Sequence, residues 1–237
     1  DVTDNFRLIF GGRYTVDDKS YNSVDRARVD NRGNINEDET FSQFTWRAGF
    51  EYFATESSMV YFNASTGFKS GGFNNQGSAA IVDQAFNQFI GTNVLIEDIY
   101  DKEVSSAFEA GVKGSGLNGR LTFDVAGYYT QVDDMQFFEF FVGGFGLLRV
   151  VYNIDEVELY GAEANLTFEI IDGWDIFGSA NVTESEIKAN SSRPSTVGNE
   201  SPYTADYTVN IGTQAVSPIS DRLDAVVRVD YRLTGPT

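Results

Sequence analysis

Apolar and polar residues alternate along much of the chain, and this period-2 pattern is the feature that most restricts its fold. In residues 221–234, Val227 and Tyr231 fall on one face, whereas Arg228 falls on the other. Such alternation predicts β-strands whose two faces meet different environments. The nine strands that we expect cover residues 4–16, 40–54, 58–68, 104–115, 120–132, 155–170, 174–187, 203–216 and 221–234.

The connections between these strands alternate strictly between short and long. The expected tight turns are residues 55–57, 116–119, 171–173 and 217–220, and the expected long loops are residues 17–39, 69–103, 133–154 and 188–202. All tight turns would then lie at one end of the sheet, which is typical of outer-membrane barrels with short periplasmic turns and long extracellular loops. A soluble sandwich mixes connection lengths at both ends. We therefore predict an all-β fold, an antiparallel up-and-down transmembrane β-barrel.

Composition agrees with this class and excludes several functions. The 23 Gly, 20 Phe and 12 Tyr against 4 Pro favour a sheet with many turns. A net charge of -18 opposes binding to nucleic acid. The chain has no Cys and no His, the residues that supply thiolate zinc sites and the usual general base. Residues 30–39 are acidic, but Arg32 breaks the calcium-loop pattern. We expect no metal site, no cofactor and no enzymatic activity.

The number of expected strands indicates whether this chain can close a barrel by itself. Nine antiparallel strands place the first and the last in the same direction, whereas bacterial single-chain barrels have even strand numbers. We therefore expect an interior piece of a larger barrel.

Three segments then point to a family. They are YFNASTGFKSGGFN (61–74), VSSAFEAGVKGSGLNGRLTFDVAGYYTQVDDMQ (104–136) and YGAEANLTFEIIDGWDIFGSANV (160–182). Together with FRLIFGGRYTVDDKSY (6–21), they closely resemble the C-terminal barrel of TonB-dependent receptors of the outer membrane. The order and spacing of these segments are more specific than any one of them.

The resemblance implies a roughly 22-stranded barrel with a plugged lumen in the outer membrane of a Gram-negative bacterium. It implies active uptake of a scarce small-molecule ligand such as a ferric siderophore, cobalamin or an oligosaccharide. Its partners would be outer-membrane lipid and the TonB energy-coupling complex, which acts through a plug region. Residues 1–237 would be part of the barrel domain, with the plug domain and the C-terminal strands absent.

Two stretches supply candidate ligand-binding residues. In GFKSGGFN (67–74), the Gly71–Gly72 pair lets the backbone leave a strand. This stretch is either a plain strand end or the start of a ligand vestibule lined by Lys69, Phe73, Asn74, Asn75 and Gln76. Residues 133–154 hold a Phe cluster that either folds over itself or contacts an aromatic or sugar ligand. The contacts would be Phe137, Phe138, Phe140 and Phe141.

Aromatic residues near strand ends are expected at the membrane interfaces. Phe68 and Tyr129 lie near the long-loop ends of their strands, and Trp174 follows a tight turn. Such positions match the aromatic girdles of membrane barrels.

Two other functions are compatible with the same strands. A passive porin would need no plug domain, and a surface β-rich adhesin would bury the apolar faces in a core. The aromatic residues near the strand ends favour a membrane barrel over the adhesin.

Overall fold

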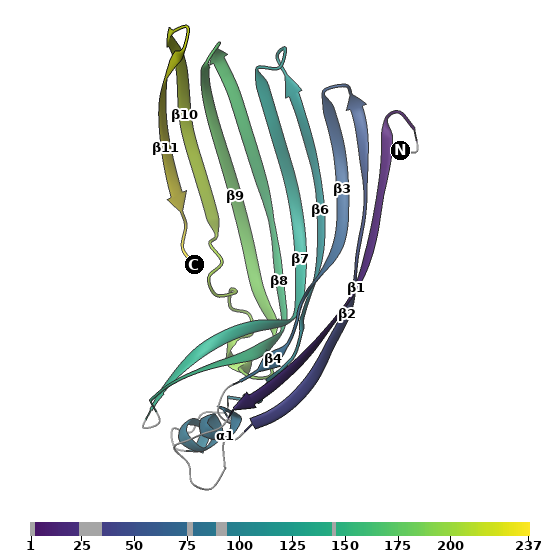
Figure 1. Cartoon of the computed structure of the whole chain (residues 1–237), viewed down its shortest axis with the longest axis vertical. Coiled ribbons are helices and arrows are strands. Elements are labelled where there is room, and N and C mark those ends of the chain that lie inside the picture. The colour runs from purple at the N-terminus through teal and green to yellow at the C-terminus, as the bar shows by residue number, and fades with distance from the viewer. Residues whose placement is uncertain (1–2, 24–34, 75–77, 89–93, 144–145) are drawn as a thin grey trace.

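The structure is a computed structural model that describes residues 3–23, 35–74, 78–88, 94–143 and 146–237. Its main element is a nine-stranded antiparallel sheet whose strands lie side by side in chain order. Figure 1 shows it as a curved wall, with the tight turns at the top and the long connections at the bottom. The strands are β1 (Phe6–Ser23), β2 (Ile35–Thr55), β3 (Ser58–Lys69), β6 (Glu103–Gly116), β7 (Leu121–Gly143), β8 (Gly146–Ile171), β9 (Trp174–Ala189), β10 (Tyr207–Ser220) and β11 (Leu223–Thr234).

The smaller elements lie in the long connections. The β3–β6 connection holds a two-stranded sheet of β4 (Gly72–Phe73) and β5 (Ile99–Tyr100), together with α1 (Ser78–Val82) and the π-helix η1 (Asp83–Asn87). The 3-10 helix η2 (Pro194–Thr196) follows β9. Among the described residues, no helix is both long and apolar enough to cross a membrane.

The nine predicted strands and their antiparallel order are confirmed. The sheet ends at β1 and β11, so the described chain forms an open wall and not a closed barrel.

Three predicted connections are wrong. The loop predicted at 17–39 is too long, because β1 continues to Ser23, which pairs with Ile35 at the start of β2. Residues 133–154 are not a loop: β7 and β8 stay paired up to Gly143 opposite Gly146. The turn predicted at 217–220 lies at residues 221–222, because β10 continues to Ser220 past an irregularity next to Pro218. Proline lacks an N–H and is tolerated at such a break in the ladder. Of the acidic stretch 30–39, residues 30–34 lie outside the described residues and the remainder begins β2.

The register places apolar residues in rows across one face of the wall. One row runs through Phe50, Phe62, Ala110, Gly127 and Ala162, each paired with the next across adjacent strands. Many apolar residues of this outward face are exposed; Phe10, for example, is 74% exposed and Tyr231 is 63% exposed. An apolar face without cover fits a wall that meets lipid.

The opposite, inward face carries charges and glycine–aromatic pairs. Lys113 and Asp124 form an ion pair at 2.8 Å. Gly111 and Gly161 each lie beneath the ring of a directly paired tyrosine, Tyr61 and Tyr128 respectively. A Cβ at either glycine would overlap that ring, so the rings fill the space that the glycines leave.

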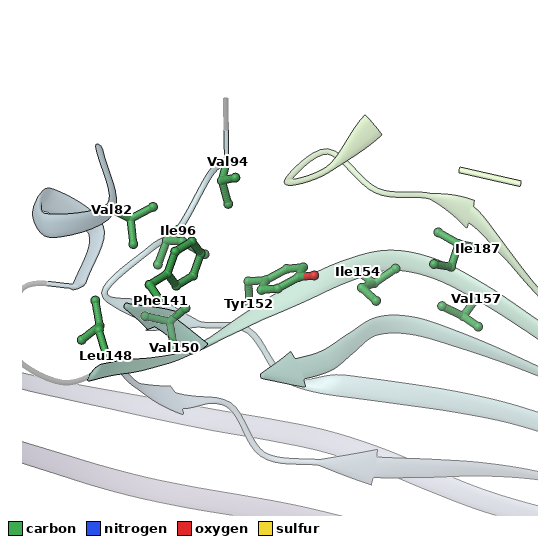
Figure 2. Packing of buried hydrophobic residues seen from close by; sticks show 10 residues of the cluster. All are labelled: Val82, Val94, Ile96, Phe141, Leu148, Val150, Tyr152, Ile154, Val157 and Ile187. Carbon is green, nitrogen blue, oxygen red and sulfur yellow. The ribbon is translucent and has the colours of Figure 1, made fainter. Parts of the chain in front are cut away.

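The buried apolar core lies at the long-connection end of the wall. Figure 2 shows how β7 and β8, the end of β9 and the β3–β6 connection contribute to it. Val150 and Val157 of β8 are fully buried. The cluster comprises Val82, Val94, Ile96, Phe141, Leu148, Val150, Tyr152, Ile154, Val157 and Ile187.

Candidate ligand-binding site

A cavity of about 540 Å³ lies between the β7–β8 hairpin and the segment that follows β9. This volume is within the usual range of about 300–1,000 Å³ for small-molecule sites. The hairpin supplies one wall, and residues 190–203 supply the other. We call it the hairpin pocket; it is lined by Phe137, Phe138, Glu139, Phe140, Tyr152, Ile154, Ile187, Asn190, Arg193, Thr196, Asn199, Glu200, Pro202 and Tyr203.

Aromatic rings form one part of the hairpin pocket. The ring centroid of Phe137 lies 5.8 Å from Tyr152, 6.0 Å from Phe138 and 6.1 Å from Tyr203. The rings of Phe138 and Phe140 lie 5.7 Å apart and are 39% and 53% exposed, respectively. These distances are those of favourable ring contacts. The guanidinium of Arg149 also lies over the Phe138 ring, 4.8 Å from its centroid, so Phe140 is the more open of the two rings.

A charged pair lies among these rings. The guanidinium of Arg193 donates to the carboxylate of Glu139. The Nε of Arg193 is buried and has no hydrogen-bond partner within the described part of the chain. Burial raises the pKa of the Tyr152 phenol, so this group stays a neutral donor. The pocket therefore combines flat apolar surfaces with an Arg193–Glu139 ion pair.

The predicted Phe cluster divides into two roles. Phe137, Phe138 and Phe140 line the hairpin pocket, and their contact with ligand stays a prediction. Phe141 is only 5% exposed and lies in the buried core. The structure thus assigns Phe141 to packing.

The GFKSGGFN stretch lies apart from the hairpin pocket. Lys69 faces Glu103 at 3.8 Å, and the ring of Phe73 stacks on Tyr21 at 5.7 Å. Asn74 is 3% exposed. Its amide donates to the carbonyls of Glu97 and Val151 and accepts from the Val151 N–H, at 2.6–2.8 Å. Asn75 and Gln76 lie outside the described residues.

The two glycines of this stretch are required by packing. At Gly71 a Cβ would overlap the ring of Phe41, and at Gly72 it would overlap the ring of Tyr100. Lys19 of β1 donates to the carbonyl of Gly71 at 2.6 Å. The stretch therefore attaches the β3–β6 connection to the β1–β2 hairpin.

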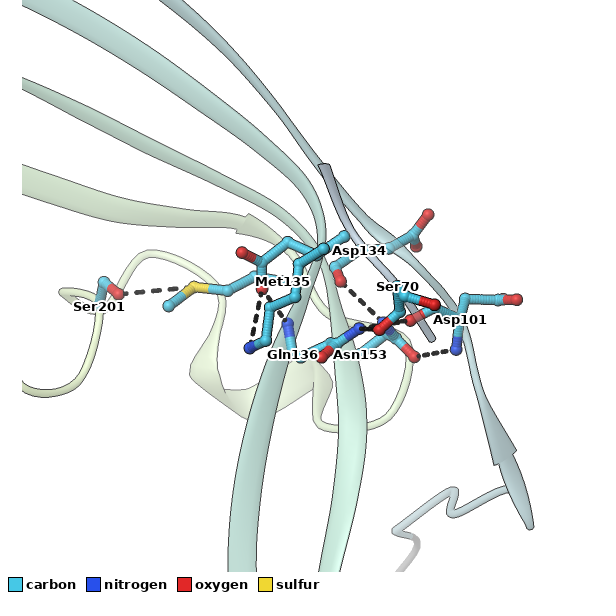
Figure 3. Close-up of polar contacts among 9 residues, drawn as sticks. Ser70, Asp101, Asp134, Met135, Gln136, Asn153 and Ser201 are labelled. Carbon is cyan, nitrogen blue, oxygen red and sulfur yellow. Dashed lines mark hydrogen bonds and ion pairs between the residues drawn. The ribbon is translucent and has the colours of Figure 1, made fainter. Parts of the chain in front are cut away.

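A second set of contacts attaches the same connection to the β7–β8 hairpin. Gln136 donates to the carbonyls of Ser70 and Asp101 at 2.9 and 3.0 Å. Asn153 donates to the carbonyls of Asp134 and Asp101 at 2.7 and 3.1 Å. We call this group the hairpin neck; Figure 3 shows its amides gathered where the hairpin leaves the wall.

Sequence reasoning missed Tyr152, Arg193 and Tyr203 in the pocket and Gln136 and Asn153 in the neck. Tyr203 has a positive φ of 64°, and it lies more than 60 residues from Phe137 in the chain. No local pattern connects these positions, so only the tertiary structure identifies them.

The predicted interface aromatics lie on the outward face. Phe68 lies two residues after Thr66 on β3 and therefore on the same outward face, and Tyr129 pairs with Phe108 and Tyr160. The Tyr129 hydroxyl donates to Glu158 at 2.6 Å, and Trp174 donates to Thr213 at 2.8 Å. Their location at the membrane interfaces stays a prediction.

A family model described as TonB dependent receptor-like, beta-barrel matches residues 1–237. The structure is similar to the ferric yersiniabactin uptake receptor FyuA from Yersinia pestis, with a TM-score of 0.71 and 20% identity over 99% of this chain and 32% of that one. For the siderophore receptor PiuA from Acinetobacter baumannii, the TM-score is 0.64 at 17% identity, over 91% of this chain and 29% of that one.

The copper transporter OprC has a TM-score of 0.64 at 15% identity, over 90% of this chain and 30% of that one. At these identities the likeness shows the fold alone. The chain spans about a third of the length of these structures. The family and these neighbours are receptors and transporters, in agreement with the prediction that the chain is not an enzyme.

Proposed function

Since the chain belongs to the TonB-dependent receptor family, we propose that it forms part of the wall and the ligand-facing segments of an uptake receptor in the outer membrane of a Gram-negative bacterium. The barrel would be completed by further strands, and a plug domain would couple it to the TonB complex. This part of the proposal rests on the family, because the described residues supply only an open wall.

We further propose a ferric siderophore as the ligand, in preference to cobalamin or an oligosaccharide. FyuA is a ferric yersiniabactin uptake receptor, and PiuA is a siderophore receptor. The observation that carries the proposal is the hairpin pocket, where the Phe137, Phe138 and Phe140 rings lie beside the Arg193 guanidinium. Chelates with aromatic, anionic iron-binding groups can use both features.

The test uses the full-length receptor and a panel of ferric siderophores, with affinities measured by calorimetry. Replacing both Phe138 and Phe140 with Ala should weaken binding of the recognised chelate at least tenfold, since an aromatic contact of this kind contributes more than about 1 kcal/mol. Arg193→Gln should weaken anionic chelates more than neutral ones. Phe10→Ala, on the outward face, is the control. Unchanged affinity in both pocket variants would show that the ligand binds elsewhere.

Uptake of radioactive iron separates active transport from a passive channel. Cells that carry the full-length receptor should lose uptake when the TonB partner is deleted. Uptake that persists at the same rate without that partner would favour the passive porin.

A further inference from the structure

The β7–β8 hairpin has two unlike faces beyond the neck, because successive residues of a strand point to opposite sides. Leu148, Val150 and Tyr152 point to one side and lie in the buried core. The residues between them, with their partners across the hairpin, form the other side. We call this side the arm face; it comprises Phe138 opposite Val151, Phe140 opposite Arg149, and Val142 opposite Leu147.

The arm face is apolar apart from one charge. Phe140, Val142 and Leu147 are each more than half exposed. Phe138 and Phe140 also line the hairpin pocket, so the arm face continues into that pocket. Its charged residue is Arg149, which is exposed. A flat apolar surface and a group of strong hydrogen-bond donors therefore lie side by side on the arm face.

The guanidinium of Arg149 is oriented by an aromatic ring. Its central carbon lies 4.8 Å from the centroid of the Phe138 ring, which is a cation–π distance. Within the described part of the chain, no oxygen accepts a hydrogen bond from this guanidinium and no carboxylate pairs with it. Its N–H groups are therefore available to an external acceptor.

Other basic side chains at the same end of the wall already have polar partners. These partners are carbonyl oxygens for Lys19 and Lys102, and carboxylates for Lys69, Lys188 and Arg193. The chain has a net charge of -18, so its overall field repels an anion. An anionic ligand that approaches the hairpin therefore depends on a local cation, and Arg149 can supply one without breaking an existing ion pair.

We propose that Arg149 is the main anion contact of the hairpin pocket and selects chelates whose aromatic rings carry anionic oxygens, such as phenolates. A ligand ring packs on Phe140, and its oxygen accepts hydrogen bonds from the guanidinium directly opposite on β8. Arg193 already shares its guanidinium with Glu139, so Arg149 contributes the larger part of the preference for an anion. This inference rests on the siderophore function proposed above.

The test measures the affinity of the full-length receptor by calorimetry for two probes, an anionic ferric catecholate chelate and a neutral ferric hydroxamate chelate. Arg149→Gln removes the charge and keeps a long polar side chain. Arg222→Gln is the matched control, because it removes the same charge from the exposed turn between β10 and β11, at the opposite end of the wall. Replacing both Phe138 and Phe140 with Ala reports whether the hairpin pocket is used.

We expect the wild type to bind the catecholate chelate more tightly than the hydroxamate chelate. Arg149→Gln should weaken catecholate binding roughly three- to tenfold, more than Arg193→Gln does, and leave hydroxamate binding unchanged. This loss should shrink as the salt concentration rises, since screening weakens an exposed ionic contact. Arg222→Gln should bind both probes as the wild type does.

Three results would overturn the role of Arg149. They are unchanged catecholate binding in Arg149→Gln, equal weakening of both probes, which would mean that Arg149 only supports the Phe138 ring, and a wild-type preference for the hydroxamate chelate. If the phenylalanine double variant weakens binding in these cases, the hairpin pocket stands and only the role of Arg149 is lost. If that variant binds both probes as the wild type does, or the wild type binds neither probe, the proposed function fails and this inference fails with it.

Discussion

The side chain of Asn74 provides the sharpest test of how the β3–β6 connection is held. Its amide makes three hydrogen bonds to backbone groups of Glu97 and Val151 while remaining 3% exposed. Asn74→Ala removes all three. A hydrogen bond of this kind contributes about 0.5–1.5 kcal/mol net, so the attachment of the connection to β8 should weaken by about 2–4 kcal/mol.

Hydrogen exchange at Val151 reports this attachment directly, because its N–H donates to Asn74. Every 1.4 kcal/mol corresponds to about tenfold, so exchange of the Val151 amide should accelerate by roughly 30- to 1,000-fold in peptides that cover residues 148–154 of the full-length protein. Asn165→Ala, at an exposed position of β8 toward the tight-turn end, is the control and should leave these peptides unchanged. If exchange is unchanged in Asn74→Ala and ligand affinity falls, Asn74 contacts ligand and the reasoning above is refuted.

Three further changes test the wall and the hairpin neck. Val227→Arg on the outward face should reduce the yield of folded barrel in outer-membrane fractions, at a cost of about 2–4 kcal/mol near the midplane, whereas Asp230→Asn should not; equal yields would contradict the assigned faces. Gly111→Ala should overpack the site against the paired tyrosine ring and lower the free energy of unfolding by about 1–3 kcal/mol. Gly116→Ala, where a Cβ meets nothing within 4 Å, should leave that free energy unchanged. Burial, followed by three neighbouring aspartates, raises the pKa of the Asp134 carboxyl; the folded hairpin neck therefore holds this proton more tightly and loses stability as the pH rises above the usual value of about 4. Protection of the neck amides, measured relative to the intrinsic exchange rate at each pH, should be lower at pH 8 than at pH 5, and Asp134→Asn should reduce that difference.

The wall could be predicted from sequence because a single physical rule controls it. A strand between lipid and an aqueous lumen alternates apolar and polar residues, and residues 223–234 follow this alternation with Val226 as the exception. Segregation of short and long connections then fixed the strand order.

The hairpin could not be predicted in the same way, because its pattern changes phase. Along β8 the buried positions are Leu148, Val150, Tyr152 and Ile154, and the next is Val157. Two residues separate the last pair where one separates the others. On β7 the change coincides with Asp134, whose φ of 54° turns the strand. The period-two alternation breaks at such a point, so the sequence predicts that the strand ends there.

The candidate site was predictable only in part. The dense aromatic cluster after the period-two part of β7 predicts exposed rings at Phe138 and Phe140. Arg193 reaches them from a different segment, and nothing local relates the two. At Asn74, a polar side chain in a polar stretch is equally compatible with ligand contact and with backbone capping, and only its neighbours Glu97 and Val151 decide between them.

The continuous pairing of β7 and β8 also sets how far the hairpin extends beyond the neck. Residues 134–143 advance about 3.3 Å each, so the hairpin adds roughly 30 Å of contour beyond the neck. This equals the thickness of the hydrocarbon core, about 30 Å. In Figure 1 the hairpin bends to one side at the long-connection end instead of continuing along the wall. Its length therefore sets how much of that end of the sheet the arm crosses, independently of the number of strands in the wall.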